Sequence, residues 1–182
     1  MARVVYSAAM SLDGYIAGPG GDMAWLARHF GPDPDAEELA AGAGALLVGA
    51  RTYRGDDPNA GTDAEGAFGG TWSGPTIVVT HHPDAAPPPD VTFVGTVVEG
   101  LDRARAAAGD RDVHILGADL ARQCLALGAV DQIAVSVVPE MIGDGVRLFH
   151  EAGGVSVQLE RTRLTGLPHA TTLWYRVVKA GG

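Results

Sequence analysis

Cysteine, long apolar runs and basic residues are all scarce in this chain, and each scarcity excludes a class of protein. The single cysteine, Cys124, rules out an intramolecular disulfide. No apolar run approaches the roughly 18 residues that a membrane span requires. Lys and Arg number 13 against 22 Asp and Glu, which gives a net charge of −9 and argues against nucleic acid and anionic membranes as partners. An anionic ligand would therefore need local arginines or backbone amides.

Metal-ligand patterns and common catalytic motifs are missing as well. The 6 histidines are scattered apart from the pair His81 and His82, and no paired cysteines occur, so we expect no metal site. Neither a Gly-x-Ser-x-Gly elbow nor a Gly-x-x-x-x-Gly-Lys phosphate loop is present. Residues 1–6 lead straight into a strand pattern without a signal-peptide core, which favours a cytoplasmic protein.

Alternating strand and helix patterns fill most of the chain. Short apolar runs predict strands at 4–9, 45–49, 76–80, 91–94, 113–116, 132–139, 155–165 and 171–179. Helices are expected at 23–30, 35–43, 50–53, 97–108 and 118–127. Strand–helix repeats with short turns imply a mainly parallel sheet covered on both faces, and the last strands imply an antiparallel C-terminal hairpin. No linker divides the chain, so we expect one α/β domain over residues 1–182.

Two glycine-rich segments interrupt this pattern. Residues 11–22 have too much glycine and proline for regular structure over much of their length. Such a loop is either a mobile lid or a plain connection. Residues 54–74 are polar and glycine-rich, and a surface loop is expected there.

The segment 113–120 carries the strongest functional signal. An apolar strand runs directly into Gly117, and a helix begins at Ala118. This arrangement directs the free N–H groups of a helix start toward the carboxyl edge of a sheet, where a phosphate can be held without a side chain. The alternative is that Gly117 serves only a buried turn.

Four short segments together resemble a known family. They are SLDGYIA at 11–17, LVGARTY at 47–53, ILGA at 115–118 with LGAVDQ at 127–132, and VPEMIGDGVRLF at 138–149. In this order they resemble the dihydrofolate reductase-like superfamily, and most closely its riboflavin-biosynthesis reductase branch, the RibD C-terminal domain. The resemblance covers nearly the whole chain. It implies a three-layer α/β fold with a mainly parallel, twisted sheet of about eight strands and an antiparallel C-terminal hairpin.

The resemblance also implies that NADPH binds across the carboxyl ends of the strands and gives a hydride to a small heterocycle or imine. A first phosphate-binding turn would comprise Gly49, Arg51 and Thr52, with Thr80 and His81 near the adenosine 2′-phosphate. A second turn, facing the pyrophosphate, would comprise Gly117, Ala118, Asp119 and Leu120. Ala9, Ile16 and residues 20–22 would line the nicotinamide pocket. Because a carboxylate repels a pyrophosphate, we expect Asp119 to cap its helix or to point away.

Substrate-side residues are harder to assign. Trp25 and Asp22 are the candidates for substrate binding, although Trp25 could equally seal the core. Reduction of a C=N or C=C bond needs a proton as well as a hydride. The candidate donors are Asp13, Asp22, Tyr53 and ordered water, with a loop-capping role as the alternative for Asp13.

Three positions depart from the family pattern. Folate reductases carry a carboxylate on the first helix, whereas the comparable position here falls near His29 or Phe30, so dihydrofolate is a poor substrate guess. Ala50 replaces a basic residue that many relatives carry after the strand glycine, so NADH is not excluded as the cofactor. Ala118 stands where folate reductases have a second glycine.

The functional hypothesis is therefore an NADPH-dependent reductase of a small molecule, such as a ribosylaminopyrimidine of riboflavin biosynthesis. This is the type of reaction that a 5-amino-6-(5-phosphoribosylamino)uracil reductase performs. The alternatives are a non-catalytic nucleotide- or flavin-binding module and an interaction protein that uses its C-terminal strand edge. Relatives often pair through C-terminal strands, so a homodimer is expected, with Trp174 and Tyr175 as candidate anchors.

Overall fold

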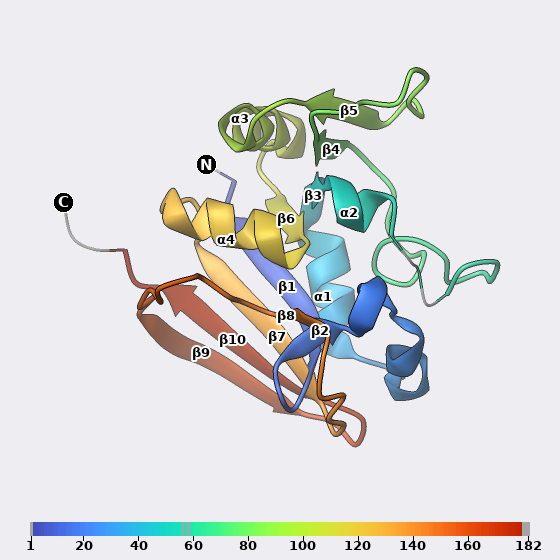
Figure 1. The fold of residues 1–182 in the computed structure, drawn as a ribbon, viewed down its shortest axis with the longest axis vertical. Coiled ribbons are helices and arrows are strands. Elements are labelled where there is room, and N and C mark those ends of the chain that lie inside the picture. Colours follow the sequence, from blue (N-terminus) through green and yellow to red (C-terminus); the bar gives the residue numbers. More distant parts are fainter. Residues whose placement is uncertain (1, 56, 58, 180–182) are drawn as a thin grey trace.

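A central eight-stranded sheet organises the computed structural model, which describes residues 2–55, 57 and 59–179 (Figure 1). The strand order is β5-β4-β3-β6-β1-β7-β10-β9. In chain order these strands are β1 Val4–Ser11, β3 Ala43–Gly49, β4 Thr76–Val79, β5 Val91–Val94, β6 Asp112–Leu116, β7 Gln132–Val138, β9 Leu159–Gly166 and β10 Thr171–Val177. The first six pair in parallel, and β10 pairs antiparallel with both β7 and β9. The predicted sheet is confirmed.

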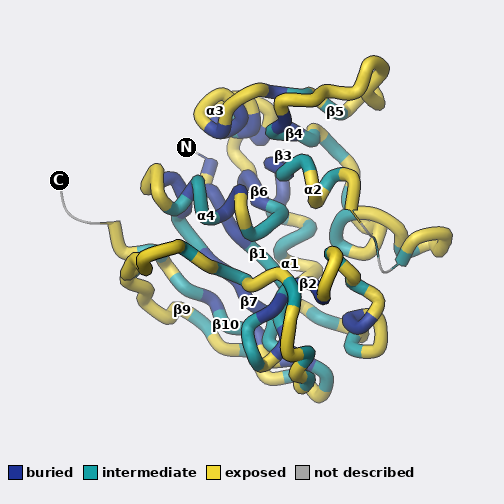
Figure 2. The backbone as a smooth tube through the Cα atoms, viewed as in Figure 1, coloured by how far each residue is buried: buried dark blue, intermediate teal, exposed yellow. Residues whose placement is uncertain are grey.

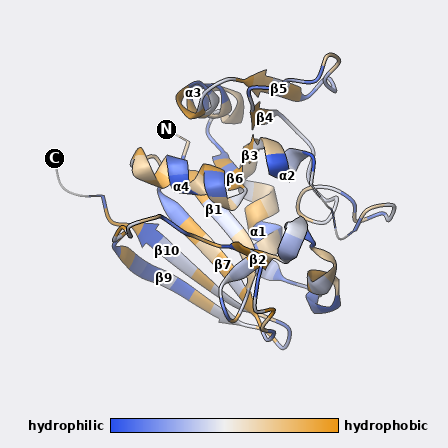
Figure 3. Ribbon diagram, in the orientation of Figure 1, coloured by the Kyte–Doolittle hydropathy of each residue, from blue (hydrophilic) through white to orange (hydrophobic). Residues whose placement is uncertain are grey.

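Helices cover both faces of this sheet and complete three layers. The helices α3 (Val97–Ala108) and α4 (Ala118–Ala126) pack on one face over the main apolar core, and α1 (Pro34–Gly42) lies on the other. Figure 2 shows that burial is concentrated in the central strands, whereas β9 is largely exposed. Figure 3 shows the matching hydropathy, with apolar residues along the inner strands. The buried thiol of Cys124 belongs to the core, and burial raises its pKa to about 12. It is therefore unreactive.

The region expected as a helix over 23–30 is 3₁₀ rather than α. Two short 3₁₀ segments, η1 (Pro19–Gly21) and η2 (Ala24–His29), precede α1. Asp33 is the N-cap of α1, where its carboxylate accepts hydrogen bonds from the N–H groups of Asp35 and Ala36. The backbone bonds of η2 have the three-residue spacing of a 3₁₀-helix, since the N–H of Leu26 donates to the carbonyl of Met23 and that of Phe30 to the carbonyl of Ala27.

The glycine-rich segment after β1 is a fixed connection in this structure. Its short strand β2 (Tyr15–Ala17) pairs with β8 (Val146–Arg147) in a second, two-stranded sheet that the sequence did not predict. The backbone of Leu12 donates to the carbonyl of Glu140, at 2.7 Å. These contacts join the loops that follow β1 and β7, two neighbouring strands of the main sheet.

The described residues of the segment 54–74 form a surface loop, as predicted, because none of them is buried, but aromatic side chains in this loop pack on the sheet. Phe68 and Trp72 pack against the outer sheet residues Leu46, Val48 and Val78, and the Trp72 indole donates to the carbonyl of Ala43 at 3.0 Å. The segment therefore covers part of the sheet.

The C-terminal strands differ from expectation in two respects. The strand predicted at 155–165 begins only at Leu159. Leu159 pairs with Val177, and Val177 is the last residue of β10. Trp174 is only 4 % exposed and donates to the carboxylate of Asp35 in its own chain. It is therefore not available as a dimer anchor, and the homodimer itself stays a prediction. Among the described residues, no helix is long and apolar enough to cross a membrane.

Candidate functional site

Two glycine turns meet at one edge of the sheet. The strands β3 and β6 are parallel neighbours, with Val48 opposite Leu116, so Gly49 and Gly117 leave the sheet at the same level. A Cβ atom placed on Gly117 would overlap Oγ1 of Thr52, and one placed on Gly49 would lie 3.7 Å from the Cβ of Leu120. The two turns that the sequence singled out therefore contact each other.

The start of α4 is suited to an anion. Its N-cap, Gly117, has a φ of +106°, a backbone conformation that glycine adopts without strain, and no side chain caps the helix. Asp119 lies in the first turn, where its carboxylate contacts Arg122 at 3.1 Å and Gln123 at 2.9 Å. Asp119 thus interacts along the helix and leaves the backbone N–H groups of the helix start without a side-chain acceptor.

A second part of the edge follows β3 and β4. The helix α2 (Ala50–Tyr53) begins directly after Gly49, and Arg51 is exposed on it. Since Gly49 pairs with Val79 in the parallel strand β4, Thr80 and His81 follow at the same edge. Thr80 is buried, and its hydroxyl accepts from the N–H of His82 at 3.0 Å, whereas His81 is exposed.

Arg54 is already paired within the protein. It contacts the carboxylate of Asp84 at 2.8 Å and the carbonyl of His82 at 2.7 Å. The exposed Arg51 is therefore the better placed arginine for an anionic ligand.

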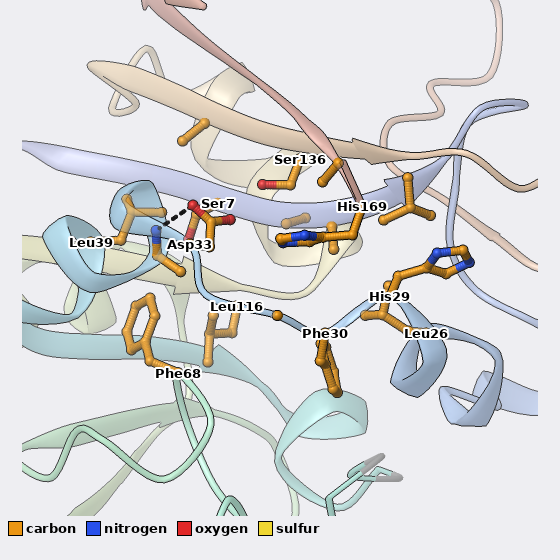
Figure 4. Close-up of a pocket in the computed structure, with 17 residues that line it drawn as sticks. Ser7, Leu26, His29, Phe30, Asp33, Leu39, Phe68, Leu116, Ser136 and His169 are labelled. Carbon is orange, nitrogen blue, oxygen red and sulfur yellow. Dashed lines mark hydrogen bonds between the residues drawn. The ribbon is translucent and has the colours of Figure 1, made fainter. Parts of the chain in front are cut away.

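A cavity of about 290 Å³ lies beside the paired turns (Figure 4). Its walls come from β1, β7, η2, the start of α1 and the β9–β10 turn, together with Phe68 and Leu116. Leu116 immediately precedes Gly117, so the cavity and the α4 turn share a wall. The polar side chains in its lining are Ser7, His29, Asp33, Ser136 and His169. Most of the remaining wall is apolar, as in typical small-molecule sites.

The predicted nicotinamide and substrate residues divide between cavity and core. Ala9 lines the cavity, whereas Ile16 and Trp25 do not. Trp25 is 8 % exposed and packs with Leu26, Val138 and Ala170, which corresponds to its core-sealing alternative. Asp22 is exposed and accepts from the N–H of Ala24 at 2.8 Å, away from the cavity lining.

None of the three candidate proton donors lines the cavity in the part of the chain that the structure describes. Asp13 accepts hydrogen bonds from the Ser11 hydroxyl and from the N–H groups of Ile142 and Gly143, at 2.6, 3.2 and 2.7 Å. These bonds, that from Ser11 above all, lower the pKa of Asp13, so it stays ionised and is unsuited to donating a proton. Tyr53 packs edge-on against Phe93, at 5.6 Å between ring centres.

One carboxylate that the sequence did not single out lines the cavity. Asp33 reaches it from the N-cap of α1, whereas the resemblance places the carboxylate of folate reductases near His29 or Phe30. An Asp before Pro34 at a helix start is a readable capping signal, since proline favours the first helical position. His29 also lines the cavity, and its Nε2 lies 2.6 Å from Oε2 of Glu140.

The cavity wall also includes the hydroxyl groups of Ser7 and Ser136, which no sequence motif indicated. Ser136 lies 2.8 Å from the buried hydroxyl of Thr172, across the β7–β10 pairing. Residue 136 faces the cavity together with Ser7 of the adjacent strand β1. Only the register of these strands brings the three hydroxyl groups to one place.

Comparison with solved structures shows the same fold in several reductases. A protein assigned to riboflavin biosynthesis from Shewanella sp. PV-4 is 24 % identical, with a TM-score of 0.74 over 98 % of this chain and 100 % of that one. A deaminase/5-amino-6-(5-phosphoribosylamino)uracil reductase from Thermotoga maritima is 19 % identical, with a TM-score of 0.68 over 97 % of this chain and 57 % of that one. Dihydrofolate reductase from Enterococcus faecalis, complexed with NADP(H), is 16 % identical, with a TM-score of 0.62 over 97 % of both chains.

No curated protein matches the chain. A family model, the RibD C-terminal domain, matches residues 2–173. This range includes both glycine turns and every residue that lines the cavity. The chain therefore belongs to the RibD C-terminal domain family.

Proposed function

We propose that this chain is an NADPH-dependent reductase that transfers a hydride to a small heterocyclic substrate. The observation that carries the proposal is the contact between the Gly49 and Gly117 turns, with the cavity beginning at Leu116 next to them. A dinucleotide held by both turns would place its nicotinamide end beside the cavity. In open α/β sheets, ligands bind at this carboxyl edge of the strands.

The residues at this edge fit the cofactor. The uncapped start of α4 offers N–H donors to a pyrophosphate, and Gly117 lets the chain approach closely because it has no Cβ atom. Arg51 and His81 are exposed at the same edge and would contact the 2′-phosphate. When bound, NADPH supplies the hydride. These local donors matter because the chain as a whole carries a net charge of −9.

The cavity favours a one- or two-ring heterocycle as the substrate. Its volume of about 290 Å³ is at the lower end of the range for small-molecule sites. Apolar walls exclude water, while Ser7, Ser136 and Asp33 offer hydrogen bonds to ring nitrogens and carbonyl groups. The Thermotoga maritima neighbour is a reductase of 5-amino-6-(5-phosphoribosylamino)uracil. We propose a substrate of that class, a ribosylated aminopyrimidine.

Oxidation of NADPH against a panel of substrates tests this function. The panel contains 5-amino-6-(5-phosphoribosylamino)uracil, dihydrofolate, other pterins and flavins, with NADH in parallel reactions. We expect loss of NADPH absorbance with the aminopyrimidine and little with dihydrofolate. Binding of NADPH without oxidation by any member of the panel would replace the reductase with a nucleotide-binding module.

A further inference from the structure

We propose that His169 is the proton donor of this reductase, an inference that rests on the proposed function. His169 precedes Ala170 in the β9–β10 turn and lines the cavity. Figure 4 shows its imidazole extending among the other lining side chains, between Ser136 and Phe30. The side chain thus occupies the place in which a substrate would meet a proton donor.

The turn that carries His169 is anchored on both sides. The backbone N–H of Leu167 donates to the carbonyl of Ala170 at 2.8 Å, which closes the turn. Ala170 is buried in the small core that also contains Trp25 and Val138. The imidazole is therefore delivered by a rigid hairpin end, which limits the positions that its ring can take.

Gly31 makes room for the ring. A Cβ atom on Gly31 would lie 3.0 Å from Cε1, 3.1 Å from Nδ1 and 3.3 Å from Nε2 of His169. Any other residue at position 31 would push the imidazole by a few tenths of an ångström. The Nε2 atom itself is buried and has no hydrogen-bond partner among the described residues. Packing against Gly31 therefore holds the ring, and no described residue supplies a hydrogen bond to this nitrogen.

The other titratable side chains of the cavity are engaged elsewhere. Asp33 faces the cavity from α1, but its Oδ1 accepts the N–H groups of Asp35 and Ala36 and so serves as the helix cap. His29 faces it from η2, but its Nε2 is bound to Glu140 at 2.6 Å. The neighbouring strands β1 and β7 contribute only the hydroxyl groups of Ser7 and Ser136 to the polar lining. His169 is thus the titratable group best placed to donate.

The chemistry balances with one hydride and one proton. NADPH, when bound, would supply a hydride to the carbon of a substrate C=N bond, and the electron pair of that bond would move to the nitrogen. The imidazolium of His169 gives its proton to this nitrogen and becomes neutral. The nicotinamide is oxidised, the imine is reduced to an amine, and water reprotonates His169 after the product leaves.

His169→Asn tests the proposal, with His150→Gln as its control because His150 is an exposed histidine outside the cavity. We expect H169N to lower kcat by about 100-fold or more, the usual contribution of a positioned acid. Its Kd for NADPH should stay within about threefold of wild type. Wild-type kcat should fall as the pH rises and the imidazolium is lost, and H169N should lack this fall.

Gly31→Ala provides a second variant in case H169N does not fold. This variant keeps the acid but displaces it, so we expect kcat to fall by about tenfold with the pH dependence retained. Perturbation of the His169 imidazole NMR signals by 5,6-diaminouracil gives a readout that is independent of turnover.

The outcomes separate the two proposals. If wild type reduces the aminopyrimidine and H169N stays within threefold of it at every pH, His169 is not the donor and the reductase proposal stands. If H169N does not fold, an unchanged kcat in G31A likewise overturns the assignment. If wild type binds NADPH but oxidises it with no substrate, the reductase proposal fails and the donor assignment fails with it.

Discussion

Gly117 and Thr52 are in direct contact, although they belong to turns that follow different strands. A Cβ atom on Gly117 would overlap the Thr52 hydroxyl and would lie 3.5 Å from the Thr52 Cβ. The absence of a side chain at position 117 therefore allows the start of α4 to approach α2. This contact defines the part of the sheet edge where we place the dinucleotide.

Replacing Gly117 with alanine should damage both stability and cofactor binding. The φ of +106° is unfavourable for alanine, so we expect a loss of about 1–3 kcal/mol in the free energy of unfolding. The overlap with Thr52 should also separate the turns and weaken NADPH binding by at least about tenfold, the equivalent of 1.4 kcal/mol. Urea unfolding and fluorescence titration with NADPH measure the two effects.

Gly128→Ala is the matched control for this variant. Gly128 also has a positive φ, +63°, but a Cβ atom there would meet nothing within 4 Å. It should lose some stability and bind NADPH normally. Wild-type NADPH affinity in G117A would show that the paired turns do not hold the cofactor.

Arg51→Ala should weaken NADPH binding by about 1–3 kcal/mol, roughly 5- to 150-fold in Kd, the usual size of a hydrogen bond to a charged group. Arg51 is exposed at the cofactor edge, whereas Arg103, the control, pairs with Glu99 on the surface of α3. R103A should bind NADPH as wild type does. If R51A weakens NADH as much as NADPH, Arg51 contacts the pyrophosphate rather than the 2′-phosphate. An unchanged Kd removes Arg51 from the site.

Stability should fall in mild acid because of His114. This residue lies on β6, is 1 % exposed, and burial lowers its pKa from 6.5 to about 4, with a smaller opposing effect from Asp112. Between these values the unfolded chain binds a proton that the folded chain does not. The contribution of neutral His114 to stability is therefore complete above about pH 6.5 and lost progressively as the pH falls to 4, by about 3 kcal/mol in total.

Urea unfolding across this pH range isolates the effect when wild type is compared with His114→Leu. Leucine cannot take up the proton, so the free energy of unfolding of H114L should depend less steeply on pH over this window. The slope is the readout, because the substitution also changes the packing of residue 114 against Phe68, whose ring centre is 5.4 Å away. Equal slopes would mean that folding does not lower the pKa of His114.

The sequence predicts the elements of this fold better than it predicts its cavity. A strand–glycine–helix pattern predicts the turns at Gly49 and Gly117, and the family resemblance places the two turns together. The proximity of β3 and β6 is not readable from chain order, because β4, β5 and α3 lie between them. Asp33 carries a local signal as a helix cap, yet nothing local indicates that it faces a cavity.

His169 and Gly31 show most clearly which part of the cavity the sequence cannot predict. They lie far apart in the sequence and meet because the β9–β10 turn packs against the segment between η2 and α1. The three proton-donor candidates of the sequence lie outside the cavity lining, although their residue types suit the chemistry. Asp13 stands in a family motif, but the loop after β7 uses its carboxylate to hold two backbone N–H groups. Such use depends on tertiary contacts, which residue type alone does not reveal.

The C-terminal strands offer a last test, through the buried contact between Trp174 and Asp35. The indole Nε1 donates to Oδ1 of Asp35 at 2.9 Å, and Asp35 is only 3 % exposed. Arg163 Nη2 lies 2.6 Å from the same oxygen without hydrogen-bond geometry, and its guanidinium carbon is 4.2 Å from the centre of the indole ring. Trp174→Phe keeps most of the apolar surface but removes the donor, so it should lower the free energy of unfolding by about 1–3 kcal/mol.

A double-mutant cycle with Asp35→Ala, which removes the acceptor, separates this hydrogen bond from general packing. If the bond couples the two residues, the double variant should lose less stability than the sum of the single variants, by at least about 0.5 kcal/mol. NADPH affinity should not change, because neither residue belongs to the proposed cofactor edge. Additive losses in urea unfolding would mean that the two residues are not coupled and that Trp174 stabilises the fold through the packing of its ring.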